Sequence, residues 1–184
     1  MTTGTVVLVE GRSDRVAVEA LAARLGYDLR TAHASIVDVG GVTNFRSHLE
    51  TLGPKGQNLR VAGLCDHAER DIVIRALEAA QVGHAITPRS MAALGFFVCE
   101  ADLEDELLKA VGVPAVLATI EACGDLTRFR LTQRQLPYRT ASLKTQVRHL
   151  MTQRKIEYAP HLVAAMDLKK VPEPLAALLR FVMR

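Results

Sequence analysis

Several residue types and patterns that mark particular classes of protein are scarce or missing. The 184 residues include no tryptophan and only 4% aromatic residues, which argues against stacking platforms for single-stranded bases. No apolar run approaches the roughly 20 residues that cross a bilayer, and the start of the chain lacks the basic and apolar regions of a secretory signal. Cys65, Cys99 and Cys123 lack the spacing of a zinc site, so we expect reduced cysteines and a cytoplasmic protein without membrane contact.

Acidic and basic residues are unevenly distributed along the chain. Residues 1–127 hold 11 Lys and Arg against 17 Asp and Glu, a net charge of −6, whereas residues 128–184 hold 12 against 3, a net charge of +9. An acidic part followed by a basic part indicates a cation site in the first and a contact with a polyanion in the second. A solvated basic helical surface that contacts no partner is the alternative interpretation of the second part.

Short β-branched apolar runs alternate with segments of helical periodicity in the first 112 residues. Thr5 to Val9, for example, is too short for a helix and ends at Glu10, as a buried strand would. Alternation of this kind predicts an α/β fold in which helices flank both faces of a parallel sheet, although the strand order cannot be derived. Ser13 and Thr43 are the expected caps of the first two helices. The predicted strands span 5–9, 35–39, 59–65 and 96–99, and the predicted helices span 14–25, 44–52, 71–80 and 102–111.

Strand patterns end after Gly112, and the remainder of the chain is predicted to be helical. Prolines punctuate this part, Pro160 among them, and we expect them to separate its helices. The chain therefore divides into an α/β domain over residues 1–112 and a basic helical extension over residues 113–184, packed on the same domain. The predicted helices of the extension span 114–122, 142–153, 159–168 and 174–183.

Acidic residues follow three of the predicted strands. Glu10 comes after the first strand, Asp66 after the third, and Glu100 and Asp102 after the fourth. The carboxyl ends of parallel strands meet at the sheet edge where ligands bind, and a sharp turn after Glu10 brings Asp14 back beside it. Carboxylates gathered there raise one another's pKa unless a cation neutralises them. Because the ligands are all oxygen atoms, the pattern favours Mg²⁺, Mn²⁺ or Ca²⁺ over zinc.

Four segments, in order, resemble the motifs of a known family. Residues 9–14 resemble the first Toprim motif, in which a Glu closes the first strand and an acid follows in the next turn, and residues 64–66 resemble the start of the second motif. Residues 39–45 and 102–105 resemble the Toprim domains of overcoming lysogenization defect (OLD) family nucleases. The resemblance extends well over residues 5–112 and implies a Toprim-like sheet flanked by helices.

The resemblance also implies roles for particular acids. Glu10 would act near the scissile phosphate or hold one metal ion, and Asp14 and Asp66 would be metal ligands. Glu104 matches the late acid of the OLD pattern and is a further predicted ligand. The implied cofactor is Mg²⁺ or Mn²⁺, as one or two ions.

One position departs from the family pattern. The second Toprim motif reads Asp-x-Asp, but Ala68 stands where the second Asp is expected, and alanine cannot bind a metal. Either Glu69 or His67 replaces it, or one metal site is lost, and we include Glu69 among the predicted ligands. A lost ligand would favour a single-metal site that is slow or inert, because a two-metal mechanism needs both ions.

The function implied by the resemblance is that of a metal-dependent endonuclease that hydrolyses DNA phosphodiester bonds. The family uses a lysine of its C-terminal segment to stabilise charge on the phosphate, and Lys155 is the candidate, with Lys144 as the alternative. The basic segment 128–184 would hold the DNA backbone without reading its sequence. The alternative is a non-catalytic Toprim module that binds metal and nucleic acid and works with a separate ATPase or other partner, since OLD proteins usually pair the Toprim domain with an ATPase and no P-loop is seen here. A homo-oligomer is compatible with either function.

Overall fold

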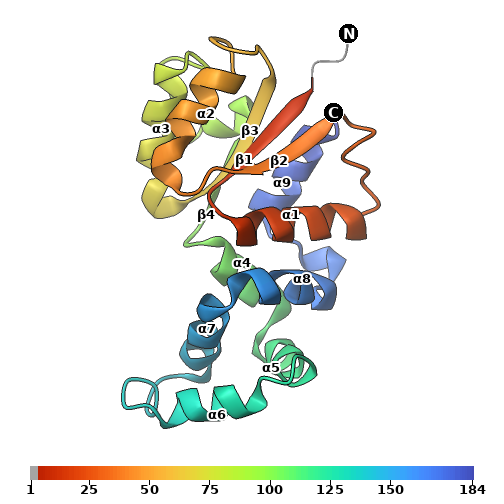
Figure 1. The fold of residues 1–184 in the computed structure, drawn as a ribbon, viewed down its shortest axis with the longest axis vertical. Helices are drawn as coiled ribbons and strands as arrows, with labels where there is room; N and C mark the ends of the chain where they lie inside the picture. Colours follow the sequence, from red (N-terminus) through yellow and green to blue (C-terminus); the bar gives the residue numbers. More distant parts are fainter. Residues whose placement is uncertain (1–3) are drawn as a thin grey trace.

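A four-stranded parallel sheet occupies one end of an elongated molecule (Figure 1). The computed structural model describes residues 4–184, so residues 1–3, on which the predicted lack of a secretory signal partly rests, lie outside the described part. The strand order is β2-β1-β3-β4, which the sequence did not reveal, and all three strand pairings are parallel. The strands are β1 (Thr5–Val9), β2 (Ala34–Asp38), β3 (Arg60–Asp66) and β4 (Phe96–Cys99), each within one residue of its prediction.

Helices cover both faces of this sheet, as predicted. Alternate side chains of β1 point to opposite faces, so Val7 enters one hydrophobic core and Leu8 the other. The core around Val7 is closed by α1 (Arg12–Arg24) and α9 (Glu173–Val182), and the core around Leu8 by α2 (Phe45–Leu52) and α3 (Arg70–Ala79).

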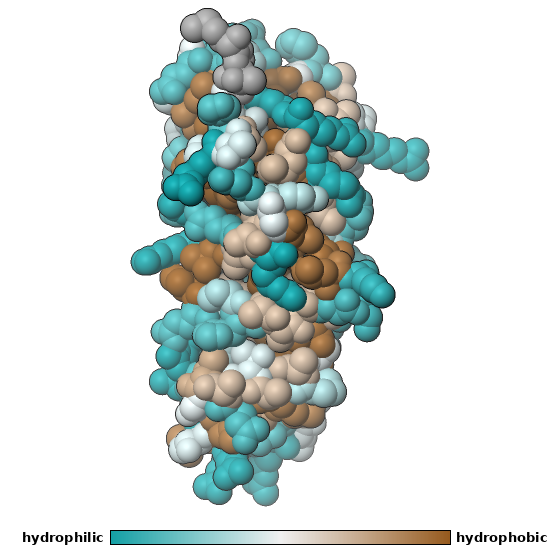
Figure 2. Space-filling model, turned by 90° about the vertical axis from the view of Figure 1, so that its right-hand side faces the viewer, coloured by the Kyte–Doolittle hydropathy of each residue, from teal (hydrophilic) through white to brown (hydrophobic). Residues whose placement is uncertain are grey.

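The remaining helices form a second layer beyond the carboxyl edge of the sheet (Figure 1). They share one continuous hydrophobic core with the sheet, which includes Val7 of β1 and Leu162 of α8. Among the described helices, α1 and α8 pack against each other most extensively. Within residues 4–184 no helix is both long and apolar enough to cross a bilayer. On the face that Figure 2 shows, hydrophilic side chains interrupt the apolar patches. These helices are α4 (Leu103–Val111), α5 (Val113–Ala122), α6 (Leu126–Arg134), α7 (Leu143–Gln153) and α8 (Lys155–Ala165).

The helical layer differs from the prediction in two places. Helix α6 was not predicted, because its polar, arginine-rich sequence buries only Phe129 and Thr132 and shows little apolar periodicity. Helix α8 begins at Lys155 and continues through Pro160, although the prediction used this proline as a break. Pro160 is the sixth of the eleven residues of α8, so it removes one backbone hydrogen bond from the middle of the helix. Burial of neighbouring side chains such as Tyr158 and Leu162 offsets that loss.

Candidate metal and phosphate site

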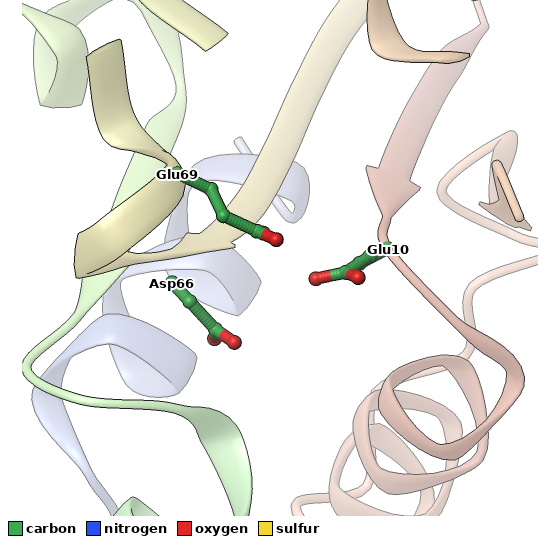
Figure 3. A group of neighbouring side chains, drawn as sticks. All are labelled: Glu10, Asp66 and Glu69. Carbon is green, nitrogen blue, oxygen red and sulfur yellow. The ribbon is translucent and has the colours of Figure 1, made fainter. Parts of the chain in front are cut away.

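Three carboxylates gather where β1 and β3 end. Glu10 follows β1, Asp66 closes β3, and Glu69 ends the 3₁₀ turn that comes directly after it. One carboxylate oxygen from each residue lies within 4.8 Å of the other two, and Figure 3 shows the three side chains pointing toward one another. Because β1 and β3 are neighbours paired in register, their carboxyl ends necessarily meet. We refer to Glu10, Asp66 and Glu69 as the acidic triad.

Asp14 lies beside the triad because of the turn that starts α1. Gly11, not the predicted Ser13, is the N-cap, and its backbone N–H donates a 2.9 Å hydrogen bond to Oδ2 of Asp14. Burial, followed by the negative charge of Glu104, raises the pKa of Asp14 to about 6, against the Gly11 hydrogen bond that lowers it. Asp14 therefore faces the same crowded negative region as the triad.

The triad itself carries more negative charge than its surroundings neutralise. Burial, followed by repulsion from Asp14, raises the pKa of Asp66 to about 7. Burial and the adjacent Glu10 carboxyl raise the pKa of Glu69 to about 8. Oε2 of Glu69 is buried and accepts no hydrogen bond from the described residues. An unpartnered buried oxygen among converging carboxylates fits a divalent cation of the oxygen-binding type.

Lys155 supplies a positive charge close to Glu104 and Asp14. Its Nζ lies 3.0 Å from Oε1 of Glu104, a charge contact that lacks the alignment of a hydrogen bond. Partial burial lowers the pKa of Lys155, but Glu104, Asp14 and Asp102 outweigh that effect and raise it. Glu104 is only 8% exposed, so a buried carboxylate holds the ammonium group at the rim of the site.

Known proteins share this fold and part of this sequence. A family described as "Overcoming lysogenization defect protein-like, TOPRIM domain" matches residues 3–67. Residues 3–67 are therefore similar to an OLD-like Toprim domain, and the whole chain shares the fold of C-terminal regions of OLD proteins. The C-terminal region of the Xanthomonas campestris pv. campestris OLD protein superposes with a TM-score of 0.76 at 26% identity, over 98% of this chain and 92% of that one. The C-terminal region of the Burkholderia pseudomallei OLD protein gives a TM-score of 0.75 at 22% identity, over 100% and 98% of the two chains. No curated protein matches this sequence.

The second Toprim motif is where the structure adds most to the sequence. Ala68 is exposed and contributes no ligand, and the His67 side chain is exposed and outside the triad. Glu69, one place later, is brought beside Asp66 because the chain enters a 3₁₀ turn after β3. Toprim domains bind divalent metals, and here Glu69 restores a third carboxylate to the group.

The acidic run at the start of α4 divides into two sets. Glu104 turns toward Lys155 and the site, whereas Asp105 pairs with Lys144 at 3.2 Å and Lys109 at 3.0 Å. Burial opposes these cations, but their hydrogen bonds hold the pKa of Asp105 below its usual value. Asp102 caps α4 and pairs with a cation of α7, and exposed Glu100 pairs with Lys109. These three acids anchor α4 and its surroundings rather than joining the triad, and Lys144, the alternative catalytic lysine, is engaged by Asp105.

One feature of the Toprim site escaped the sequence analysis. A groove of about 330 Å³ opens beside Lys155, between the start of α1 and the junction of α7 and α8, and Arg12 and Arg154 also line it. Arg12 comes two residues after Glu10, and this position is the only sequence signal that could have placed Arg12 in the groove. Arg154 is bound to Asp125 at 2.6 Å, whereas Arg12 takes part in no ion pair within the described residues.

Proposed function

We propose that this Toprim domain is a divalent-metal-dependent endonuclease that hydrolyses DNA phosphodiester bonds. The acidic triad carries the proposal, because three carboxylates within 4.8 Å of one another at a sheet edge form a ligand set for Mg²⁺ or Mn²⁺. When bound, such an ion supplies positive charge beside a phosphate and acidifies a water molecule.

Each residue of the site has a role in this proposal. Glu10, Asp66 and Glu69 would hold one ion, and Glu10 would act near the scissile phosphate. Asp14 and Glu104 would add ligands for a second ion, since the charge of Glu104 acts on Asp14 and both lie close to Lys155. Lys155 stabilises negative charge on the phosphate as it develops, and it is held in place by Glu104.

The surroundings of the triad support a polyanionic substrate. The groove beside Lys155 is lined by Arg12, Arg154 and Lys155, and by Glu157, which pairs with Arg154. Residues 128–184 carry a net charge of +9, which favours binding to a nucleic-acid backbone without base recognition.

We also propose that the protein is cytoplasmic. Cys65 and Cys99 are free thiols buried in strands, and the cytoplasm keeps thiols reduced.

Nicking of supercoiled plasmid in Mg²⁺ or Mn²⁺ tests the proposal. The wild-type protein should convert supercoiled to open-circular DNA, and Glu10→Gln and Asp66→Asn should remove this activity because each deletes a triad ligand. Glu121→Gln is the matched control, since Glu121 is an exposed acid outside the site whose charge change is identical. Nicking that is equal in all four proteins, or absent in the wild type, would refute the proposal.

A second function follows from one specific observation. Ala68 replaces an acid of the second Toprim motif, and Glu69 reaches the site from a different backbone position. A metal- and nucleic-acid-binding module without catalysis, acting with a separate ATPase or another partner or as a homo-oligomer, would tolerate this change. Calorimetric titration with Mg²⁺ separates the two functions, because binding without nicking favours the module. No metal binding at all would contradict both.

A further inference from the structure

The end of the helical layer farthest from the sheet presents an exposed apolar side chain among arginines. We define the α6–α7 tip as residues 128–144, at the bottom of Figure 1. Six large apolar side chains are exposed among residues 4–184, and three of them, Leu131, Leu136 and Leu143, lie on this tip. Leu136 is the most exposed of all six, at 84%. Pro137 follows it and is also exposed, so the loop projects two apolar residues into solvent.

The loop that carries Leu136 is held by its own hydrogen bonds. Buried Gln146 of α7 donates through Nε2 to the carbonyl oxygens of Tyr138 at 2.8 Å and Ala141 at 3.1 Å. Gln133 of α6 donates to Oε1 of the same glutamine at 2.8 Å, which ties both helices to the loop. The Tyr138 ring stacks on His149 at a centroid distance of 4.1 Å, and its hydroxyl lies 2.7 Å from Nδ1 of that histidine. The exposure of Leu136 is therefore a property of an ordered loop.

The charge of the tip specifies what covers it. No acidic residue occurs between Asp125 and Glu157, a stretch that contains eight Lys and Arg. Arg130, Arg134 and Arg139 are exposed and form no ion pair with any described residue. A projecting apolar pair bordered by unpaired arginines is complementary to a polyanion that also offers an apolar interior, which is the chemistry of a DNA duplex.

We propose that the α6–α7 tip inserts Leu136 between base pairs of duplex DNA from the minor groove and bends the duplex, while Arg134 and Arg139 contact the flanking phosphates. This proposal rests on the proposed function for its substrate. Apolar wedges flanked by basic side chains unstack one base step and kink the duplex. Helix α7 has 11 residues and separates the tip from Lys155. Its length of about 16 Å corresponds to about five base pairs, so the kink should lie about five base pairs from the nick.

Bending of a short duplex labelled with a donor and an acceptor dye tests the wedge. The measurement is made in EDTA with the full chain, so that it does not require metal binding or nicking. The wild-type protein should shorten the end-to-end distance, and Leu136→Ala should abolish the shortening and weaken binding about tenfold, as expected for loss of one buried leucine contact. Arg134→Gln should lower the salt dependence of binding by about one counterion.

Leu168→Ala is the matched control, because Leu168 is exposed at 40% but lies outside the tip. Equal bending by Leu136→Ala and Leu168→Ala, or a straight duplex with the wild type, overturns the wedge. Self-association measured by sedimentation also overturns the wedge, if Leu136→Ala disrupts it and leaves DNA binding unchanged. In that case the tip contacts a second copy of the protein and not DNA. Bending without nicking refutes the proposed endonuclease activity and leaves the wedge proposal intact. Nicking without Leu136-dependent bending refutes the wedge proposal and leaves the endonuclease activity intact.

Discussion

Raising the pH in the presence of a chelator should destabilise this protein, and a divalent cation should reverse the effect. Folding raises the pKa of Asp14 from 3.8 to about 6, that of Asp66 from 3.8 to about 7, and that of Glu69 from 4.5 to about 8. The folded protein therefore holds more protons than the unfolded chain between about pH 4 and pH 8, and its free energy of unfolding falls as the pH rises through that window. In most single domains the free energy of unfolding instead rises with pH over the acidic half of this range.

The size of the effect follows from the same pKa values. The change at Asp14, which is well buried, corresponds to about 3 kcal/mol of free energy between pH 4 and pH 8. Asp66 and Glu69 are more exposed, so solvent screening reduces what they add, and their titrations are linked to that of Asp14. We expect a total loss of about 3–4 kcal/mol from the site. Mn²⁺ at about 100 times its dissociation constant would return about 2.7 kcal/mol at pH 8.

Urea denaturation at several pH values, in EDTA and in Mn²⁺, measures both effects. In EDTA the free energy of unfolding should decline between pH 5 and pH 8, and Asp14→Asn should flatten the decline because asparagine does not titrate. Glu121→Gln should keep the wild-type profile. A stability in EDTA that is level or rises over this range, or an unchanged slope in Asp14→Asn, would refute the reasoning.

Three further predictions concern single side chains. Lys155→Met should lower plasmid nicking by about 100-fold while leaving Mg²⁺ binding measurable by calorimetry, and Lys155→Arg should retain more activity because it keeps the charge; equal loss in both variants would contradict a charge-stabilising role. Tyr158→Phe should lower the free energy of unfolding by about 1–2 kcal/mol in urea, because it removes a buried 2.7 Å hydrogen bond from the hydroxyl to Asp125, and an unchanged midpoint would show that this bond is dispensable. Gly95→Ala should lower the thermal midpoint by several degrees, since Gly95 has φ +87° and an added Cβ would lie 2.4 Å from Cε1 of Phe181; a midpoint equal to that of the wild type would mean that the ring of Phe181 moves freely.

Local features of the chain were enough to predict the strands and the acids that follow them. A β-branched run such as Thr5 to Val9 must be extended and buried, and its end must be marked by a residue that leaves the core, which is Glu10. The turn that returns Asp14 is equally local, because Gly11 and Asp14 are joined by one hydrogen bond three residues apart. The same locality explains the errors: α6 buries too little to show a periodic pattern, and Pro160 looks like a break when its neighbours are ignored.

The sequence by itself determined which acids follow the strands and that Asp14 returns beside Glu10, whereas Glu104 was predicted only from the resemblance to OLD proteins. Only the tertiary structure decided which of the available acids and cations face one another. The β2-β1-β3-β4 order sets Asp66 beside Glu10, and a 3₁₀ turn substitutes Glu69 for the acid missing at position 68. The physical reason is that backbone conformation depends on nearby residues, whereas convergence of side chains depends on how distant elements pack. The contact of Glu104 with Lys155, 51 residues apart, exists only because α8 packs against both α1 and α4.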